Sequence, residues 1–170
     1  IAKQNIPSGF EHLKKTLEIT TKLHDIGKAT TFFQSYLNTT DEKERAELKK
    51  KKETNHARFS ALVCFWTILA NKEIDILSPG FNLSNSEGKN ALISYIAVQR
   101  HHGDLNKPDF LFEEKDIEIF TKQLQSITEP VLLEFGKTLS INLDYEKIHL
   151  FLSNLKKLST KVKKYIMNLK

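Results

Sequence analysis

Residues 23–34 read Leu-His-Asp-Ile-Gly-Lys-Ala-Thr-Thr-Phe-Phe-Gln, and this stretch decides how the rest of the chain is interpreted. Before it, apolar residues recur at helical spacing, and the pattern continues up to His24. Gly27 follows, and glycine is common just past the C-terminus of a helix. The sequence therefore predicts a helix that Gly27 ends and that presents His24 and Asp25 at its C-terminus.

Helical periodicity dominates the remainder of the chain. Asn55 and Asp144 are candidate N-caps of later helices. Alternation with a period of two residues is scarce, which argues against a substantial sheet. We therefore expect an all-α fold, a helical bundle. The apolar faces of its predicted helices lie within residues 59–69, 92–97, 117–127, 148–155 and 158–169.

The composition indicates one globular domain. The chain has 170 residues, enough for a single domain with a well-filled core, and 39% of them are hydrophobic. The single cysteine, Cys64, lies in an apolar run, where a small buried residue is expected. No apolar stretch is long enough to cross a bilayer, and the first residues do not form a signal peptide. These features predict a cytoplasmic protein without membrane contact.

The charge is uneven along the chain. The formal net charge is +5, with basic residues gathered in Lys49–Lys52 and again after residue 155. A basic excess favours a polyanionic partner such as a nucleic acid, through the release of counterions. A solvated lysine face explains each cluster taken alone, so both interpretations stay open.

Five side chains of metal-binding type fall at the ends of three predicted helices: His24, Asp25, His56, His101 and His102. Imidazole and carboxylate ligands suit Mn, Fe, Co or Ni, with Zn possible, rather than Ca. Asp25 is the candidate bridge between two ions, because a carboxylate has two oxygens. A pair of such ions can bind a phosphate oxygen and activate a water, which suits phosphodiester hydrolysis. Each histidine taken alone is more simply a structural residue, but the combination is more specific.

The three segments resemble known motifs. His24-Asp-Ile-Gly-Lys28 resembles the signature of the HD superfamily of metal-dependent phosphohydrolases. The continuation to Phe33-Gln34 is similar to the HD nuclease domain of type I CRISPR effectors. Asn-His-Ala-Arg-Phe-Ser at 55–60 and Val-Gln-Arg-His-His-Gly-Asp-Leu at 98–105 resemble the single-histidine and paired-histidine motifs of that family.

The resemblance implies an all-helical HD domain that holds two divalent transition-metal ions and cuts single-stranded DNA in CRISPR interference, as endonuclease or exonuclease. It implies a helicase, in the same longer chain or as a partner, and a crRNA-guided complex. Lys28 would act on the phosphate, whereas as a plain surface lysine it would complement the helix dipole. By the same resemblance, His24 and Asp25 would hold the first metal, and Asp25, His56, His101 and His102 the second.

The sequence departs from the family in two ways. The family has a histidine well upstream of the His-Asp pair and an aspartate late in the domain, and neither is matched between Ile1 and Lys170. Both belong to the first metal. We therefore expect residues 1–170 to be a single HD domain cut from a longer chain, with a further helix upstream and a helix and helicase downstream. Asp144 is a weak candidate for the late aspartate.

Two other functions fit the same motifs. One is an HD nucleotide phosphohydrolase or phosphodiesterase, which activity on mononucleotides would reveal. The other is a catalytically inactive HD scaffold that binds protein or nucleic acid. The intact set of His24, Asp25, His56 and the 101–102 pair argues against the inactive scaffold, and the absent first-metal ligands argue for it.

Overall fold

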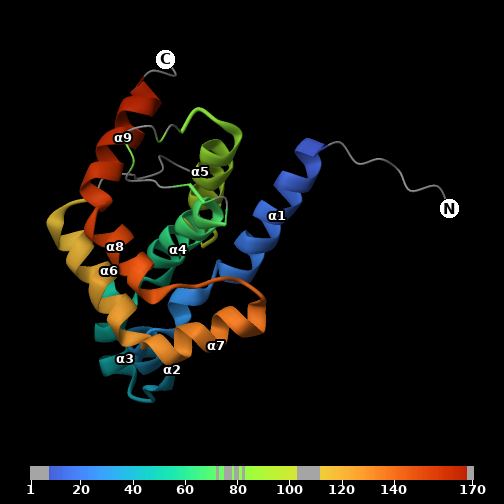
Figure 1. The fold of residues 1–170 in the computed structure, drawn as a ribbon. Helices are drawn as coiled ribbons and strands as arrows, with labels where there is room; N and C mark the ends of the chain where they lie inside the picture. The colour runs from blue at the N-terminus through green and yellow to red at the C-terminus, as the bar shows by residue number, and fades with distance from the viewer. Residues whose placement is uncertain are drawn as a thin grey trace.

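The computed structural model describes residues 8–71, 73, 74, 78, 81, 83–102 and 112–167, with side chains from Leu13 to Tyr165. Within these residues the chain forms α-helices and two short 3-10 helices, and no strand (Figure 1). The predicted all-α fold is confirmed. None of the described helices has the length and apolar character needed to span a membrane. The helices are α1 (Ser8–Leu23), η1 (Ile26–Ala29), α2 (Thr31–Asn38), α3 (Glu42–Lys50), η2 (Lys52–Thr54), α4 (His56–Ala70), α5 (Ser86–Gln99), α6 (Glu114–Ser126), α7 (Glu129–Leu139), α8 (Tyr145–Ser153) and α9 (Leu155–Met167).

Helix α4 is the centre of the bundle. Thirteen of its 15 residues are buried, ten of them apolar and distributed around the helix, as expected of a helix surrounded by others. Figure 1 shows α1 on one side of α4 and α6, α8 and α9 on the other. Helix α5 packs along α4, and α1 packs against both. Cys64 lies within this core, as predicted, and burial raises the pKa of its thiol.

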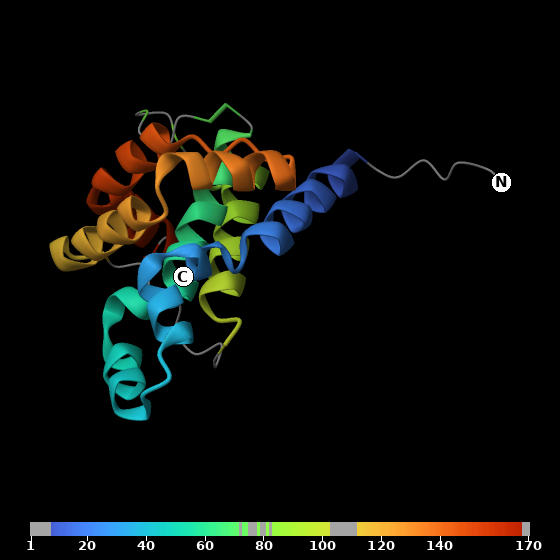
Figure 2. The ribbon, with the colours of Figure 1, turned by 90° about the horizontal axis from the view of Figure 1, so that it is seen from below.

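Helix α3 differs from the rest because none of its residues is buried. It projects from the bundle beside α2 (Figure 2).

Side-chain caps define several helix starts. Asp41 accepts a hydrogen bond from the Glu44 N–H, and Asp144 accepts one from the Lys147 N–H, which confirms Asp144 as an N-cap. Asn55 occupies the N-cap position of α4, but its side chain makes no capping bond.

The prediction that Gly27 ends the first helix is wrong. Helix α1 ends at Leu23, and Gly27 lies inside η1. No glycine of the described residues has a positive φ, so left-handed backbone is not the reason for a glycine here. The reason is close packing, because a β-carbon at Gly27 would lie 2.6 Å from the His56 carbonyl oxygen. The Gly27 N–H donates to Ser60 Oγ at 2.9 Å, which fixes η1 against α4.

Candidate metal centre

Three helix ends meet at one place and bring the five predicted ligand residues together. His24 and Asp25 directly follow α1, and His56 is the first residue of α4. His101 and His102 follow the end of α5. Residues 103–105, the rest of the paired-histidine motif, lie outside the described residues. Helices remote in sequence therefore contribute to a single cluster, and the role of its members as ligands stays a prediction.

One oxygen of Asp25 faces the three later histidines. Asp25 Oδ1 lies 3.3 Å from His56 Nε2 and 3.3 Å from His101 Nε2. His56 Nε2 lies 3.1 Å from His102 Nε2. One ligand atom from each of these four residues falls within 4.8 Å of the others. Ligands about 2.1 Å from a single ion lie roughly 3–3.4 Å from their neighbours, so the spacing fits a metal shell.

The tautomers of two of the rings, His101 and His24, leave their Nε2 atoms as acceptors. His101 Nδ1 lies 2.6 Å from the Val98 carbonyl oxygen, and His24 Nδ1 lies 2.8 Å from the Thr21 carbonyl oxygen. A carbonyl oxygen can only accept, so in the neutral rings Nδ1 carries the proton and Nε2 carries the lone pair. Ligating histidines commonly donate their second nitrogen to such a carbonyl, which fixes the ring orientation.

The surroundings of Asp25 Oδ1 favour the binding of a cation. This oxygen is buried, and no donor of the described residues hydrogen-bonds to it. In the tautomer that the Val98 carbonyl oxygen favours, with the proton on Nδ1, the His101 Nε2 lone pair faces Oδ1 across 3.3 Å. Such an arrangement is unfavourable unless a cation lies between the atoms. The donor set, one carboxylate and several imidazoles, is the set that divalent transition metals prefer.

The pKa values favour ligand-competent histidines. Burial lowers the pKa of His56 to about 4, with Lys28 and the other histidines adding to the effect and Asp25 opposing it. Burial and the adjacent His101 also lower the pKa of His102. Both rings are therefore neutral near pH 7, the form that binds metals. Burial alone would raise the pKa of Asp25, but the hydrogen bond from Lys28 and the nearby charges lower it overall, so this residue is a carboxylate.

The second oxygen of Asp25 faces the other way. Asp25 Oδ2 accepts a hydrogen bond from Lys28 Nζ at 2.8 Å and lies 3.3 Å from His24 Nε2. His24 thus faces the opposite oxygen of the carboxylate from the other histidines, although its ring also meets the His101 ring edge-on, with centroids 5.5 Å apart. Asp25 lies between two sets of partners, as a bridging carboxylate would. The Lys28 ammonium supplies positive charge on one side of it, and Gln34 donates to the Lys28 carbonyl oxygen at 2.8 Å.

Sequence reasoning missed Gln123, which supports His56 from behind. Its side chain is fully buried, and Nε2 donates to the carbonyl oxygens of Glu53 (2.7 Å) and Asn55 (3.1 Å). These bonds hold the turn that leads into α4 and so position His56. A signal was present, because Gln123 lies among the apolar residues of α6 that face the core, beside Leu124.

Replacing Gln123 with leucine is expected to loosen this turn. The variant loses both hydrogen bonds at a buried position, which costs about 1–3 kcal/mol of stability. Displacement of His56 should also weaken Mn²⁺ binding by about 10-fold, the lower end of the effect of outer partners. Urea unfolding and calorimetric titration measure the two effects. Gln125→Leu, an exposed position on the same helix, is the control and should change neither.

Replacing Gly27 with alanine should disturb the same histidine from the other side. The new methyl group meets the His56 carbonyl oxygen at 2.6 Å and the His56 β-carbon at 2.9 Å, so one of the two segments must move. We expect a loss of about 1–3 kcal/mol in the free energy of unfolding, typical of overpacking. We also expect Mn²⁺ affinity to fall about 10-fold or more.

The control is Gly136→Ala in α7. The β-carbon of the new alanine would lie 2.8 Å from the Ile141 carbonyl oxygen. This variant should destabilise the fold to a similar extent without changing Mn²⁺ affinity, measured by the same calorimetric titration. Equal Mn²⁺ binding by Gly27→Ala and the natural chain would show that the close approach of η1 to α4 does not position His56.

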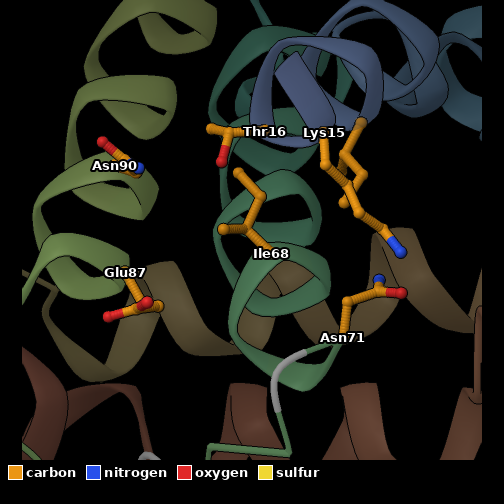
Figure 3. Close-up of a pocket in the computed structure, with 7 residues that line it drawn as sticks. Lys15, Thr16, Ile68, Asn71, Glu87 and Asn90 are labelled. Atoms are coloured by element: carbon orange, nitrogen blue, oxygen red, sulfur yellow. The ribbon is translucent and has the colours of Figure 1, made fainter. Parts of the chain in front are cut away.

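The pocket in Figure 3 is separate from this cluster. It is lined by Lys15, Thr16, Asn71, Glu87 and others, and lies toward the opposite ends of α1, α4 and α5. Its volume of about 20 Å³ is enough for one water molecule. Among its lining residues Glu87 is the one with a side chain of metal-binding type. It offers no second centre for chemistry.

Comparison with known proteins agrees with the motifs. A family model described as "Cas3, HD domain" matches residues 1–149. The CRISPR-associated nuclease/helicase Cas3 of Haloferax volcanii is 32% identical over 128 residues, which are 71% of this chain and 12% of that protein. No solved structure matches the chain. HD domains bind divalent metals, and the chain carries its His/Asp cluster at the motif positions. The chain therefore belongs to the HD-domain family of Cas3.

Proposed function

We propose that this chain is a metal-dependent nuclease that hydrolyses phosphodiester bonds of single-stranded DNA in CRISPR interference. The observation that carries the proposal is the buried Asp25 Oδ1, which lies 3.3 Å from the Nε2 atoms of His56 and His101 and has no hydrogen-bond donor among the described residues. The family supports a nuclease, and the relative from Haloferax volcanii is named a nuclease/helicase. The net charge of +5 suits a polyanionic substrate.

The proposed cofactors are two divalent transition-metal ions, of Mn, Fe, Co or Ni, with Zn possible. His24 and Asp25 are the proposed ligands of the first ion, whose other ligands would lie outside residues 1–170. Asp25 would belong to both sites and so act as the bridge. The second ion is the better supported, because its four proposed ligands cluster within 4.8 Å. The proposed ligands of the second ion are Asp25, His56, His101 and His102.

Such ions, when held by the protein, coordinate phosphate oxygens and lower the pKa of a coordinated water. The residues of the chain supply the rest. His56 and His102 are neutral near pH 7, because burial lowers their pKa values. The Val98 carbonyl oxygen fixes the orientation of the His101 ring, so the ring's Nε2 atom points at the cluster. The Lys28 ammonium, which lies 2.8 Å from Asp25 Oδ2, would pair with a phosphate oxygen of the substrate and offset charge that develops during hydrolysis.

The proposed partners follow from the same family. A helicase, fused in a longer chain or separate, would deliver single-stranded DNA to the domain, and a crRNA-guided complex would mark the target. The relative from Haloferax volcanii is named a nuclease/helicase, and the aligned part is 12% of its length. The unaligned part of that relative is long enough to hold another activity. The proposal also places the protein in the cytoplasm, as the sequence analysis expects.

The test is cleavage of circular single-stranded DNA with Mn²⁺, Co²⁺ or Ni²⁺, against an EDTA control, by this chain and by its naturally extended form. We expect metal-dependent cutting, and a circular substrate shows that no free end is needed. Cutting by the extended form alone would place the missing ligands of the first ion outside residues 1–170. Cutting of mononucleotides but not DNA would favour a nucleotide phosphohydrolase. An absence of both cutting and bound metal in the extended form would overturn the proposal.

A further inference from the structure

A row of rings leads away from the metal centre along α2. The Phe33 ring meets the His56 ring edge-on, with centroids 4.7 Å apart. The Tyr36 ring follows, 5.7 Å from that of Phe33. The Arg45 guanidinium lies over the Tyr36 ring at 5.4 Å. The row passes from a buried ring, Phe33, through a half-buried one, Tyr36, to an exposed cation on α3.

The row borders a groove between α2, α3 and η2. The groove has a volume of about 590 Å³, within the range of small-molecule sites. Phe32 lines it from α2, one turn of helix before Tyr36, and Leu48 lines it from α3, one turn after Arg45. Tyr36 and Arg45 are not among the lining residues, but residues three and four apart share a helix face, so they belong to the helix faces that border the groove.

The charge and chemistry of the groove suit a nucleotide. Lys51 lines it and belongs to the basic run Lys49–Lys52, which supplies cations for phosphate. Phe32, and the face of the Tyr36 ring that Arg45 does not cover, offer surfaces on which a base can stack. Glu53 is the one carboxylate among the lining residues, and it can accept a hydrogen bond from an exocyclic amino group of a base. Arg45 pairs with no carboxylate within the described part of the chain, so its charge is available to a ligand.

We infer that this groove binds one nucleotide of a single-stranded DNA whose next phosphates reach the metal centre. This inference rests on the proposed function and adds the path of the substrate to it. Tyr36 stacks on the base, and Lys51 and Arg45 contact phosphates on either side of it. The buried Phe33 ring contacts both the Tyr36 ring and the His56 ring, so a strand that occupies the groove lies near the cluster around Asp25.

The test is the affinity of the chain for fluorescently labelled oligodeoxycytidine, whose bases carry an exocyclic amino group, measured by fluorescence anisotropy in EDTA. Metal and cleavage are then absent, so this result does not depend on the proposed reaction. Replacing Tyr36 with alanine should weaken binding about 5- to 150-fold, the value of one stacked base. Tyr36→Phe, which keeps the ring, should bind like the natural chain. Tyr145→Ala, on α8, is the control and should leave affinity unchanged.

Two further readouts separate contact with DNA from a structural effect. An oligonucleotide with abasic sites should bind the natural chain more weakly and should lose its sensitivity to Tyr36→Ala. Lys51→Ala should reduce the slope of log affinity against log salt by roughly 0.7, the share of one contact to a single strand, whereas Lys147→Ala should not. Thermal unfolding of each variant verifies the fold.

The outcomes distinguish this inference from the proposed function. If neither Tyr36→Ala nor Lys51→Ala changes the affinity, in a chain that still cleaves DNA, DNA binding in the groove would be overturned and the proposed nuclease activity would stand. No detectable binding by the natural chain would also overturn the groove. Binding that depends on Tyr36 and Lys51, in an extended form that cleaves nothing, would support the groove and remove the proposed reaction.

Discussion

Replacing Asp25 with alanine is expected to abolish metal-dependent DNA cleavage, with a rate loss of at least about 100-fold. The substitution removes both the oxygen that faces His56 and His101 and the oxygen that faces His24 and Lys28. Neither proposed ion then has its shared ligand. The side chain of Asp25 is 35% exposed, so its loss should leave the helical bundle folded. Cleavage of circular DNA and circular dichroism measure the two effects.

The matched control is Asp144→Ala. Asp144 is the weak candidate for a late metal ligand, and in the structure it caps α8 through the Lys147 N–H. Its replacement should cost about 1 kcal/mol of stability, as expected for an N-cap, and leave cleavage unchanged. Cleavage retained by Asp25→Ala would remove Asp25 from the bridging role. Cleavage lost in Asp144→Ala, in a folded protein, would make Asp144 a functional carboxylate after all.

Replacing His56 with glutamine is expected to have the second largest effect. Glutamine fills most of the space beside Phe33 but lacks the imidazole nitrogen that lies 3.1 Å from His102 Nε2 and 3.3 Å from Asp25 Oδ1. We expect Mn²⁺ affinity to fall more than about 100-fold, because outer partners of ligands already cost 10- to 100-fold. DNA cleavage should fall with it. Calorimetric titration measures the affinity.

His149→Gln is the control for this change, since His149 lies on α8, away from the cluster of Asp25, His56 and the 101–102 pair. It should bind Mn²⁺ as the natural chain does. Unaltered affinity in His56→Gln would show that the proposed second ion does not use His56, and would reduce its ligand set to Asp25 and the histidines that follow α5.

Helix positions were predictable from local patterns, because they depend on residues close in sequence. The apolar positions from Phe59 to Leu69 predicted α4, and Asp144 predicted the start of α8. The candidate ligands were also found, because histidines next to helix ends are visible in a sequence. Their convergence could be expected only from the family resemblance, since it depends on how α1, α4 and α5 pack together.

Residues whose role comes from tertiary packing were not predictable. Gly27 looked like a helix terminator, but its missing β-carbon serves the approach of η1 to the His56 backbone. Gln123 stands out in the sequence only as a polar residue among core positions of its helix, and its two bonds to carbonyl oxygens in front of α4 depend on the packing of α6. Lys28 pairs with Asp25 in the structure, a contact that the sequence did not indicate, and its action on phosphate stays a prediction. In each case the partner lies on another segment or becomes visible only in the folded turn.

The most direct test of the metal centre is the anomalous diffraction of a crystal of the chain soaked with Mn²⁺. We predict an anomalous peak about 2.0–2.3 Å from Asp25 Oδ1 and from the Nε2 atoms of His56, His101 and His102, the distance of first-row metal bonds. A second peak on the Oδ2 side, near His24, would mark the first ion. An absence of any peak at this cluster under saturating Mn²⁺, or a peak at other residues alone, would contradict the account.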